Sequence, residues 1–363
     1  MKILHIASGD TWAGAEVQVW TLCTELVKQG HTVHAIILNP GRLAEMLAES
    51  GVTVTVLDER RFGFGKLLEK IKLELHRYQP DVIHTHRQKE NILGSLANKM
   101  TISVPAFRTV HGAPEFTPSL KQRLQIGADR FTGKRLQHGI ISVSDDLTEK
   151  LTGQFPANKI HTIANGIDAE SVRRDAEAHD NDVAINDETT QYHVGFVGRM
   201  ESVKRVDLFL KMAELVHHNA RTKHPVHFHL FGGGSLLEEH IGWAASHNLN
   251  GFVTFHGHTN IIRSWIARMN LLVMPSDHEG LPMTALESLA LGVPMVTHAT
   301  GGLIPLLNAA ACNGLVEKHC AEGYAERVEA LLNAPPKVAL PDAYTAARNA
   351  SEITALYESA LTG

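Results

Sequence analysis

Short apolar runs alternate with longer amphipathic stretches along the whole chain. In the first half, apolar runs of strand length lie at residues 2–8, 31–38, 51–57, 80–86, 105–112, 139–144 and 162–168. The stretch between the first two runs has a helical pattern that Gly30 closes. Strands that alternate with helices are typical of a parallel sheet wrapped by helices. The pattern therefore predicts an α/β fold whose first domain, residues 1–168, is Rossmann-like.

The same alternation starts again after a polar interval. Residues 169–190 are polar and acidic and lack apolar periodicity, so we expect a linker there. Further strands are expected at residues 192–198, 226–232, 251–257, 271–274 and 295–297. They predict a second Rossmann-like domain over residues 191–342, and a final helix at about 343–363 that packs back on the first domain. The cleft between two such domains is the expected binding site.

Composition narrows the class of protein. A chain of 363 residues suits two domains, and a net charge of −5 gives no general attraction to nucleic acid or to an anionic membrane. Cys23, Cys312 and Cys320 make neither a disulfide framework nor a C-x-x-C zinc motif, which favours a reducing cytoplasm. No apolar run approaches the roughly 18 residues that a membrane span needs. We therefore expect a cytoplasmic protein without a nucleic-acid partner.

Histidine is abundant, with 23 residues, and several histidines alternate within strands. The pairs lie at residues 84 and 86, 227 and 229, and 256 and 258. Alternate positions of a strand face the same way, so such a pair resembles two metal ligands. No carboxylate or cysteine joins them at a ligand-like spacing, and H-E-x-x-H is absent from the sequence. We therefore expect no metal and no cofactor.

Basic residues gather at 119–139 in an otherwise acidic chain: Lys121, Arg123, Arg130, Lys134 and Arg135. A basic helical face can hold an enzyme against anionic lipid at the inner face of a membrane, or can take a charged acceptor. An ordinary solvated helix gives the same pattern. Both interpretations stay open at the level of the sequence.

Two carboxylates stand out in residues 274–302. An apolar strand runs into a loop that carries Glu279, Pro282 marks a helix start, and Glu287 follows on that helix. Ligands of open α/β sheets lie beyond the carboxyl ends of the strands, where this loop falls. Eight helical positions would separate the two backbones by roughly 12 Å. Paired carboxylates of a glycoside hydrolase are about 5–9.5 Å apart, so two contacts on one extended ligand fit better.

Cations and glycines follow other strands of the second half. Arg199 and Lys204 lie between a strand end and a helix start, where they and backbone N–H groups can meet an anion such as a diphosphate. Glycines at 232–234 and 301–302 allow close approach to the backbone. In the first turn, Gly14 can bring a helix N-terminus to a phosphate. That turn has neither G-x-G-x-x-G nor G-K-[ST], which disfavours a nicotinamide dehydrogenase.

In chain order, the motifs are GAE, DVIHTH, VHG, SVSD, NGID, FVGRMESVKR, FGGG, FHGH and E-x7-E followed by TGG. Together they resemble the retaining glycosyltransferases of family 4, which have the GT-B fold of two Rossmann-like domains facing a central cleft. The resemblance covers nearly the whole chain, and the E-x7-E block is its most specific part. It implies transfer of a hexose-type sugar from a nucleoside diphosphate sugar to a glycan or lipid-linked acceptor, without a metal, in cell-envelope glycan biosynthesis.

The resemblance also implies roles for residues of the second domain. Arg199 and Lys204 match the pair that binds the donor diphosphate, and Glu287 matches the carboxylate that binds the ribose hydroxyls. Glu279 matches the carboxylate that holds the donor sugar. It acts with the backbone of the loop that follows, at Gly280, Leu281 and Pro282.

In the first domain, His111 matches a histidine that faces the sugar and Gly14 matches a glycine near the diphosphate. Two departures concern the donor: no acid follows Gly301-Gly302 in the family's G-G-x-x-E pattern, and Asn270 stands where aspartate is common. Two alternatives share this architecture. One is a nucleotide-sugar 2-epimerase, and the other is a non-catalytic partner that binds a nucleotide sugar.

Overall fold

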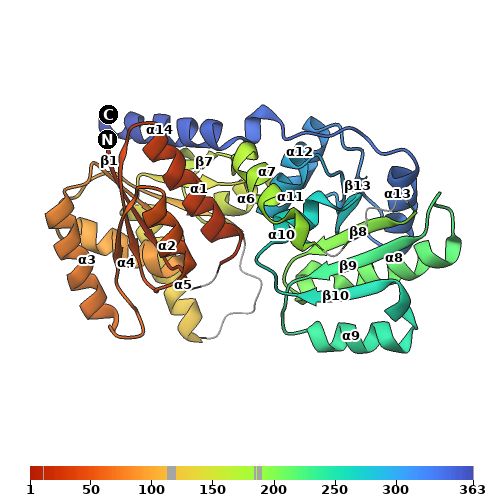
Figure 1. Cartoon of the computed structure of the whole chain (residues 1–363). Coiled ribbons are helices and arrows are strands. Elements are labelled where there is room, and N and C mark those ends of the chain that lie inside the picture. Colours follow the sequence, from red (N-terminus) through yellow and green to blue (C-terminus); the bar gives the residue numbers. More distant parts are fainter. Residues whose placement is uncertain (11, 113–119, 184, 186–189, 363) are drawn as a thin grey trace. The chain divides into compact units, whose positions relative to one another are not determined.

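The computed structural model describes residues 1–10, 12–112, 120–183, 185 and 190–362. Contacts divide the chain into two compact units, Met1–Ile167 with Ala343–Gly363, and Asp168–Asp342. Each unit holds one all-parallel sheet covered by helices (Figure 1). The predicted α/β fold with two Rossmann-like domains is confirmed.

The first unit contains a seven-stranded sheet in the order β3-β2-β1-β4-β5-β6-β7. Its strands are β1 (Lys2–Ala7), β2 (Thr32–Ile37), β3 (Thr53–Val56), β4 (Val82–Thr85), β5 (Ala106–Val110), β6 (Gly139–Ser142) and β7 (Ile160–Thr162). Its helices are α1 (Gly14–Lys28), α2 (Arg42–Glu49), α3 (Phe64–Tyr78), α4 (Gln88–Lys99), α5 (Leu120–Arg135), α6 (Asp145–Thr152) and α14 (Ala346–Thr362). The chain order reverses between β1 and β4, which makes their carboxyl ends the switch point where ligands of such sheets bind.

The last helix, α14, belongs to the first unit and packs along α1 (Figure 1). Tyr357 and Ala350 on its inner face have no exposed surface. A buried hydrogen bond of 3.0 Å joins Gln18 Nε2 of α1 to Asn349 Oδ1 of α14. The end of the chain therefore completes the core of the domain that its start builds.

The second unit contains a six-stranded sheet in the order β10-β9-β8-β11-β12-β13. Its strands are β8 (Tyr192–Val197), β9 (Val226–Phe231), β10 (Val253–Gly257), β11 (Leu271–Met274), β12 (Met295–His298) and β13 (Leu315–Val316). Its helices are α7 (Ala169–Ala178), α8 (Val206–Asn219), α9 (Leu237–Ser246), α10 (Ile262–Ala267), α11 (Met283–Ala290), α12 (Leu303–Ala309) and α13 (Ala321–Asn333). Here the switch point lies between β8 and β11.

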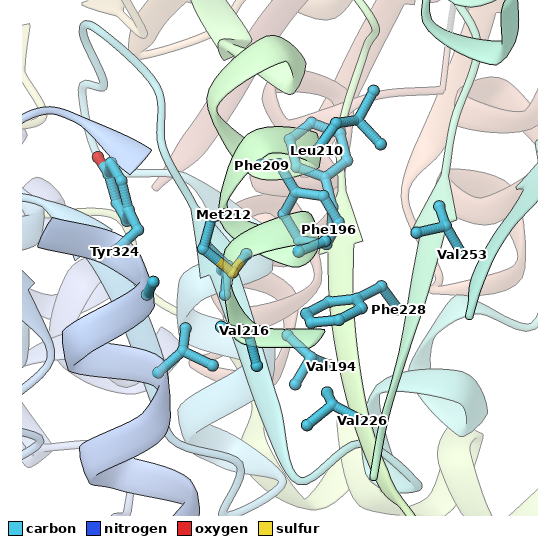
Figure 2. Close-up of a cluster of buried hydrophobic side chains, with 14 of the residues drawn as sticks. Val194, Phe196, Phe209, Leu210, Met212, Val216, Val226, Phe228, Val253 and Tyr324 are labelled. Atoms are coloured by element: carbon cyan, nitrogen blue, oxygen red, sulfur yellow. The ribbon is translucent and has the colours of Figure 1, made fainter. Parts of the chain in front are cut away.

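Apolar side chains from β8, β9 and α8 form the core of this unit (Figure 2). Phe196 of β8 and Phe228 of β9 both meet Phe209 of α8 edge to face, with ring centroids 5.6 and 5.9 Å apart. Each such buried side chain contributes about 1.5–3 kcal/mol relative to an exposed one. This core fixes β8, and with it the loop that carries Arg199 and Lys204.

The expected linker at 169–190 is not an irregular connection. Its first part is helix α7, whose Val172 and Ala176 are buried and which packs against α10 and α11. Asp168 caps the helix by accepting a hydrogen bond from Ser171 N at 3.1 Å. Only these two residues, four positions apart, form the buried face, so the segment reads as polar. Residues 184 and 186–189 lie outside the described part of the chain.

Two further details of the sheets differ from the expectation. The last strand of the first unit is β7, at Ile160–Thr162, and not the stretch 162–168. That stretch makes instead an isolated bridge from Ile167 to Thr345, which ties it to the start of α14. The two-residue strand β13 is too short to show a pattern and was not expected.

Candidate functional site

The loops that follow β8 and β11 lie at the switch point of the second sheet. Leu271 and Leu272 of β11 pair with Val194 and Gly195 of β8, so the two strands end beside each other. The backbone N–H of Asp277 donates to Val203 O at 2.9 Å, which fastens one loop to the other. The sequence-predicted residues of these loops, Arg199, Lys204 and Glu279, therefore lie at the position where sheets of this topology bind ligands.

Lys204 and Glu279 form an ion pair. Lys204 Nζ donates to Glu279 Oε1 at 2.6 Å, and the two side chains are 19% and 8% exposed. Lys204 ends the short 3-10 turn Ser202–Lys204, directly before α8, while Glu279 lies in the loop before α11. Water screens such a pair only weakly, so each charge keeps the other in place.

A second ion pair braces the same loops. Arg205 has a left-handed backbone, with φ of 52°, and its guanidinium donates to Asp207 Oδ1 at 2.9 Å and to Asp277 Oδ1 at 3.0 Å. The hydrogen bond with Asp207, and a second one with Asp277, raise the pKa of Arg205. Sequence reasoning missed Asp277 and Arg205, although both stand close to predicted site residues in the chain.

The glycine pair after β12 shapes the loop that carries Glu279. Gly302 N donates to Gly280 O at 2.7 Å. Gly301 has φ of 52°, and a Cβ there would collide with the carbonyl oxygen of Glu279. Any side chain at this position would push the Glu279 backbone away. Gly301 and Gly302 were expected to allow close approach of a ligand to the backbone, and in the structure they hold the Glu279 loop.

Glycines 232–234 have a similar role beside Arg199. Gly232 has φ of 123°, and a Cβ on it would collide with the carbonyl oxygen of Gly198. Met200 N donates to Gly233 O at 2.8 Å. The loop after β9 thus packs directly on the loop after β8. Arg199 itself is exposed.

Glu287 lies on α11 and is 8% exposed. Arg263 Nε of α10 donates to its Oε1 at 2.9 Å, and Arg263 Nη1 reaches Asp175 Oδ2 of α7 at 3.4 Å. Burial raises the pKa of Glu287, and the charge and hydrogen bond of Arg263 lower it. Sequence reasoning missed Arg263, because only the packing of α10 on α11 brings it to Glu287. Pro282 is the N-cap of α11 rather than its first helical residue.

In the first unit, the predicted residues lie at the carboxyl edge of the sheet. Gly14 begins α1, and His111 directly follows β5. Burial, and the charge of Arg87, lower the pKa of His111 to about 4. Arg87 also pairs with Glu16 and with Asp10 Oδ1, the latter at 3.0 Å. This edge is therefore polar and charged, with a neutral imidazole at His111.

The basic segment 119–139 contains α5. Its described side chains include four exposed cations at Arg123, Arg130, Lys134 and Arg135. Residue 119 and the side chain of Lys121 lie outside the described part. Two apolar side chains on the same helix, Leu124 and Phe131, are 78% and 58% exposed. They are seven positions apart, so they share one face of α5.

Three cysteines, Cys23, Cys312 and Cys320, are free thiols, as the sequence predicts. Within the described ranges, the structure has no helix that is both long and apolar enough to cross a membrane.

Two Rossmann-like units, each with an all-parallel sheet, and the cations and carboxylates at the switch point of the second agree with the GT-B class of glycosyltransferases. Comparison with known families agrees in both units. Residues 12–171 match the family described as "Glycosyltransferase Family 4", and residues 191–334 match "Glycosyl transferases group 1". The chain belongs to the family 4 glycosyltransferases, as the motifs predict.

Individual relatives are distant. A D-inositol 3-phosphate glycosyltransferase of Arthrobacter is 23% identical over 91% of this chain and 80% of its own. The UDP-Gal:alpha-D-GlcNAc-diphosphoundecaprenol alpha-1,3-galactosyltransferase of Escherichia coli is 25% identical over 65% of this chain and 60% of its own. Among solved structures, Anabaena HepE in complex with UDP and glucose superposes with a TM-score of 0.76 at 17% identity, over 100% of this chain and 97% of its own. That likeness shows the shared fold.

Proposed function

We propose that the chain is a retaining, metal-independent hexosyltransferase that uses a nucleoside diphosphate sugar. Its acceptor would be a glycan or a lipid-linked sugar in the cytoplasm, in the synthesis of a cell-envelope glycan such as lipopolysaccharide, O-antigen, capsule or exopolysaccharide. The observation that carries the proposal is the Lys204–Glu279 pair at the switch point, 2.6 Å apart. It puts a cation for a phosphate and a carboxylate for sugar hydroxyls side by side. The complex of HepE with UDP and glucose, and the UDP-Gal named for the relative from E. coli, support the class of donor.

In this proposal, donor binding exchanges one partner for another. Lys204 turns from Glu279 to the diphosphate, where Arg199 joins it, and Glu279 is released to accept hydrogen bonds from the sugar. Gly280, Leu281 and Pro282 continue the loop around that sugar. Glu287 accepts from the ribose hydroxyls, held in place by Arg263. The separation of the two glutamates in the chain then corresponds to the two ends of one extended donor.

The chemical step needs stabilisation of the leaving group. As the bond between the sugar C1 and the diphosphate breaks, negative charge grows on the phosphate oxygen, and Arg199 and Lys204 stabilise it without reorganising. The acceptor oxygen bonds to C1 from the same face, and its proton passes to the departing phosphate oxygen. Glu279 forms no covalent bond. These two cations do the work that a divalent metal does in other transferases, so we propose that no metal takes part.

The first unit would supply the remaining contacts. We assign Gly14 to the diphosphate and His111 to the transferred sugar. The acceptor would bind to the loops at the carboxyl edge of the first sheet. The face of α5 that joins cations with Leu124 and Phe131 would hold the enzyme at an anionic membrane surface.

The direct test is sugar transfer in the presence of a chelator. Purified protein, a panel of nucleoside diphosphate sugars and a panel of glycan acceptors should release nucleoside diphosphate, at the same rate with and without EDTA. Loss of activity on chelation would contradict the metal-independent mechanism. Conversion of the donor to its C2 epimer without acceptor would identify an epimerase instead. Tight donor binding with no product across the acceptor panel would identify a non-catalytic partner.

A further inference from the structure

Four histidines of the first unit form one connected stack at neighbouring strands. His5 lies on β1, His84 on β4, His86 directly after β4, and His111 directly after β5. His5 Nδ1 is 3.0 Å from His86 Nε2, and His86 Nδ1 is 3.4 Å from His111 Nε2. The ring of His86 stacks on those of His84 and His111, with centroids 4.5 and 5.7 Å away. His111 therefore ends a hydrogen-bonded chain that starts inside the core.

These rings are neutral at physiological pH. Burial lowers the pKa of His5 to about 3, and burial with the charge of Arg87 lowers the pKa of His111 to about 4. Burial also lowers the pKa of His86 well below its usual range, and neighbouring histidines and Arg87 lower it further. A neutral imidazole has one N–H and one lone pair. The position of the proton on one ring therefore fixes its position on the next.

Only two proton arrangements satisfy both hydrogen bonds. In the first, His5 Nδ1–H donates to His86, His86 Nδ1–H donates to His111 Nε2, and His111 carries its proton on Nδ1. In the second, every donor is reversed, and the last N–H lies on His5 Nε2. Within the described structure, His5 Nε2 and His111 Nδ1 are both buried atoms without a hydrogen-bond partner. The two arrangements thus differ in which of these atoms keeps an unpaired N–H.

The surroundings favour the first arrangement. His5 lies inside the core with no exposed surface, whereas His111 follows the end of its strand and is partly exposed as a residue, although its Nδ1 atom is buried in this structure. A buried N–H without an acceptor is less tolerable than a buried lone pair without a donor. The N–H therefore belongs on His111, at the ligand-binding edge, and the lone pair belongs on His5 in the core.

We infer that His86 is a positioning residue, which donates Nδ1–H to His111 Nε2 and thereby makes His111 present an Nδ1–H donor to an oxygen of the bound sugar. The inference rests on the proposed function for the identity of that ligand. The hydrogen-bond geometry alone carries the proton arrangement. A donor, rather than a lone pair, at this point suits a hydroxyl or ring oxygen and rejects a ligand N–H.

A metal ion is the competing interpretation of the cluster. The nearest ligand atoms of His5, His84 and His86 all lie within 4.8 Å of one another. However, both nitrogens of His84 already have partners, Tyr357 Oη at 2.5 Å and Thr109 Oγ1 at 2.8 Å. An ion would have to displace one of these partners from His84, and would also have to displace His5 or His111 from a nitrogen of His86. The nearby charge of Arg87 also opposes a cation.

The test reads the tautomer directly. In protein labelled with ¹⁵N and ¹³C at histidine, ring nitrogen shifts distinguish an Nδ1–H imidazole from an Nε2–H one, and the His111 signal is assigned by its loss in His111→Asn. The wild-type protein should show His111 as the Nδ1–H form without any ligand. Detection of the Nε2–H form would overturn the inference, and this measurement needs no variant of His86.

Two variants of His86 separate its two nitrogens. The amide of asparagine lies near the place of Nδ1, and that of glutamine near the place of Nε2. His86→Asn should keep the donor to His111 and its Nδ1–H form. His86→Gln should lose the donor to His111 and, with it, the Nδ1–H form of His111. Its kcat should fall by about 10- to 100-fold, the usual cost of losing an orienting partner, with little change in the KM for the sugar donor. Equal behaviour of the two variants would contradict the inference.

Two further results separate this inference from its competitors. If stoichiometric Zn²⁺ moves the signals of His5, His84 and His86 together, the cluster is a metal site and the tautomer inference fails. If the wild-type protein transfers no sugar, the proposed function fails, while the tautomer of His111 still decides the role of His86.

Discussion

Arg263 favours the charged form of the carboxyl group of Glu287. The carboxyl is buried, which raises its pKa, and the guanidinium 2.9 Å away opposes that rise. Only the ionised form offers both oxygens as acceptors to ribose hydroxyls. Glu287 was predictable from its spacing to Glu279, whereas Arg263 was not, because it is 24 positions away on another helix.

Replacement of this cation should make nucleotide binding depend on pH. In Arg263→Met the pKa of Glu287 rises further, so the carboxyl protonates as pH falls through that value, and affinity for a nucleoside diphosphate falls with it. As pH is lowered through that pKa, the variant should lose affinity about tenfold, because a charge-assisted hydrogen bond contributes about 1.5–3 kcal/mol. In the wild-type protein, where Arg263 opposes the rise of this pKa, the same loss of affinity should occur only at lower pH.

Calorimetric titration at several pH values measures this. Arg263→Lys keeps the positive charge, so its pH profile should lie between those of the wild-type protein and Arg263→Met. Glu287→Gln should bind the nucleoside diphosphate weakly at every pH. A flat profile for Arg263→Met would show that Arg263 does not control the charge of Glu287.

Gly301 tests whether the Glu279 loop needs its observed backbone. Its φ of 52°, and the carbonyl oxygen of Glu279 where a Cβ would lie, leave no room for a side chain. Gly301→Ala should displace Glu279 and lower kcat/KM about 10²-fold, as expected for a shift of about 1 Å at a reacting centre. Gly242→Ala is the matched control, because a Cβ there meets nothing within 4 Å. If both variants transfer sugar at the wild-type rate, the glycine does not shape the site.

At the scale of single elements, α5 combines cations with exposed apolar side chains. Arg123 and Arg130 are exposed beside Leu124 and Phe131 on this helix. A juxtamembrane cation contributes about 1 kcal/mol near an anionic surface, and the apolar pair adds burial in the headgroup region.

The double variant Arg123→Glu/Arg130→Glu should therefore lose most binding to vesicles that contain anionic lipid. Co-sedimentation at low and high salt measures it, and the wild-type binding should weaken as salt rises. Lys66→Glu on α3, also an exposed cation, is the control and should bind as the wild type does. Equal binding by the double variant would leave α5 as an ordinary solvated helix.

Elements with a full apolar pattern were predictable, and short or two-faced ones were not. The strands β8, β9 and β11 follow from their apolar runs, and α8 follows from its periodicity. Helix α7 was missed because its buried face consists of Val172 and Ala176 alone. The carboxylates of this segment are instead partners of other elements: Asp175 approaches Arg263, and Asp180, just beyond the helix, accepts from Arg268 Nε at 2.6 Å.

At the scale of the whole molecule, the chain crosses between its units twice, and the comparisons in both units agree on one family. The order of motifs predicted this family, because each motif lies at the end of a strand and a parallel sheet brings its strand ends to one edge. Side-chain contacts between elements that are far apart in the sequence were not predictable. The bonds of Lys204 with Glu279, and of His5 with His86, are of this kind, because they depend on the fold that brings their elements together.

The central claim is that the switch point of the second unit binds a nucleoside diphosphate, with Lys204 at the phosphates and Glu287 at the ribose. Calorimetric titration with UDP, UMP and 2′,3′-dideoxy-UDP tests both roles at once. The wild-type protein, and the control Lys211→Ala at an exposed position of α8, should prefer UDP over both analogues.

In Lys204→Ala, the preference for UDP over UMP should fall about 10- to 100-fold, while the preference for UDP over the dideoxy analogue stays. In Glu287→Gln, the preference for UDP over the dideoxy analogue should fall by a similar factor, while the preference for UDP over UMP stays. If neither variant changes either preference, or if each changes both alike, the assignment of the two ends of the donor is wrong.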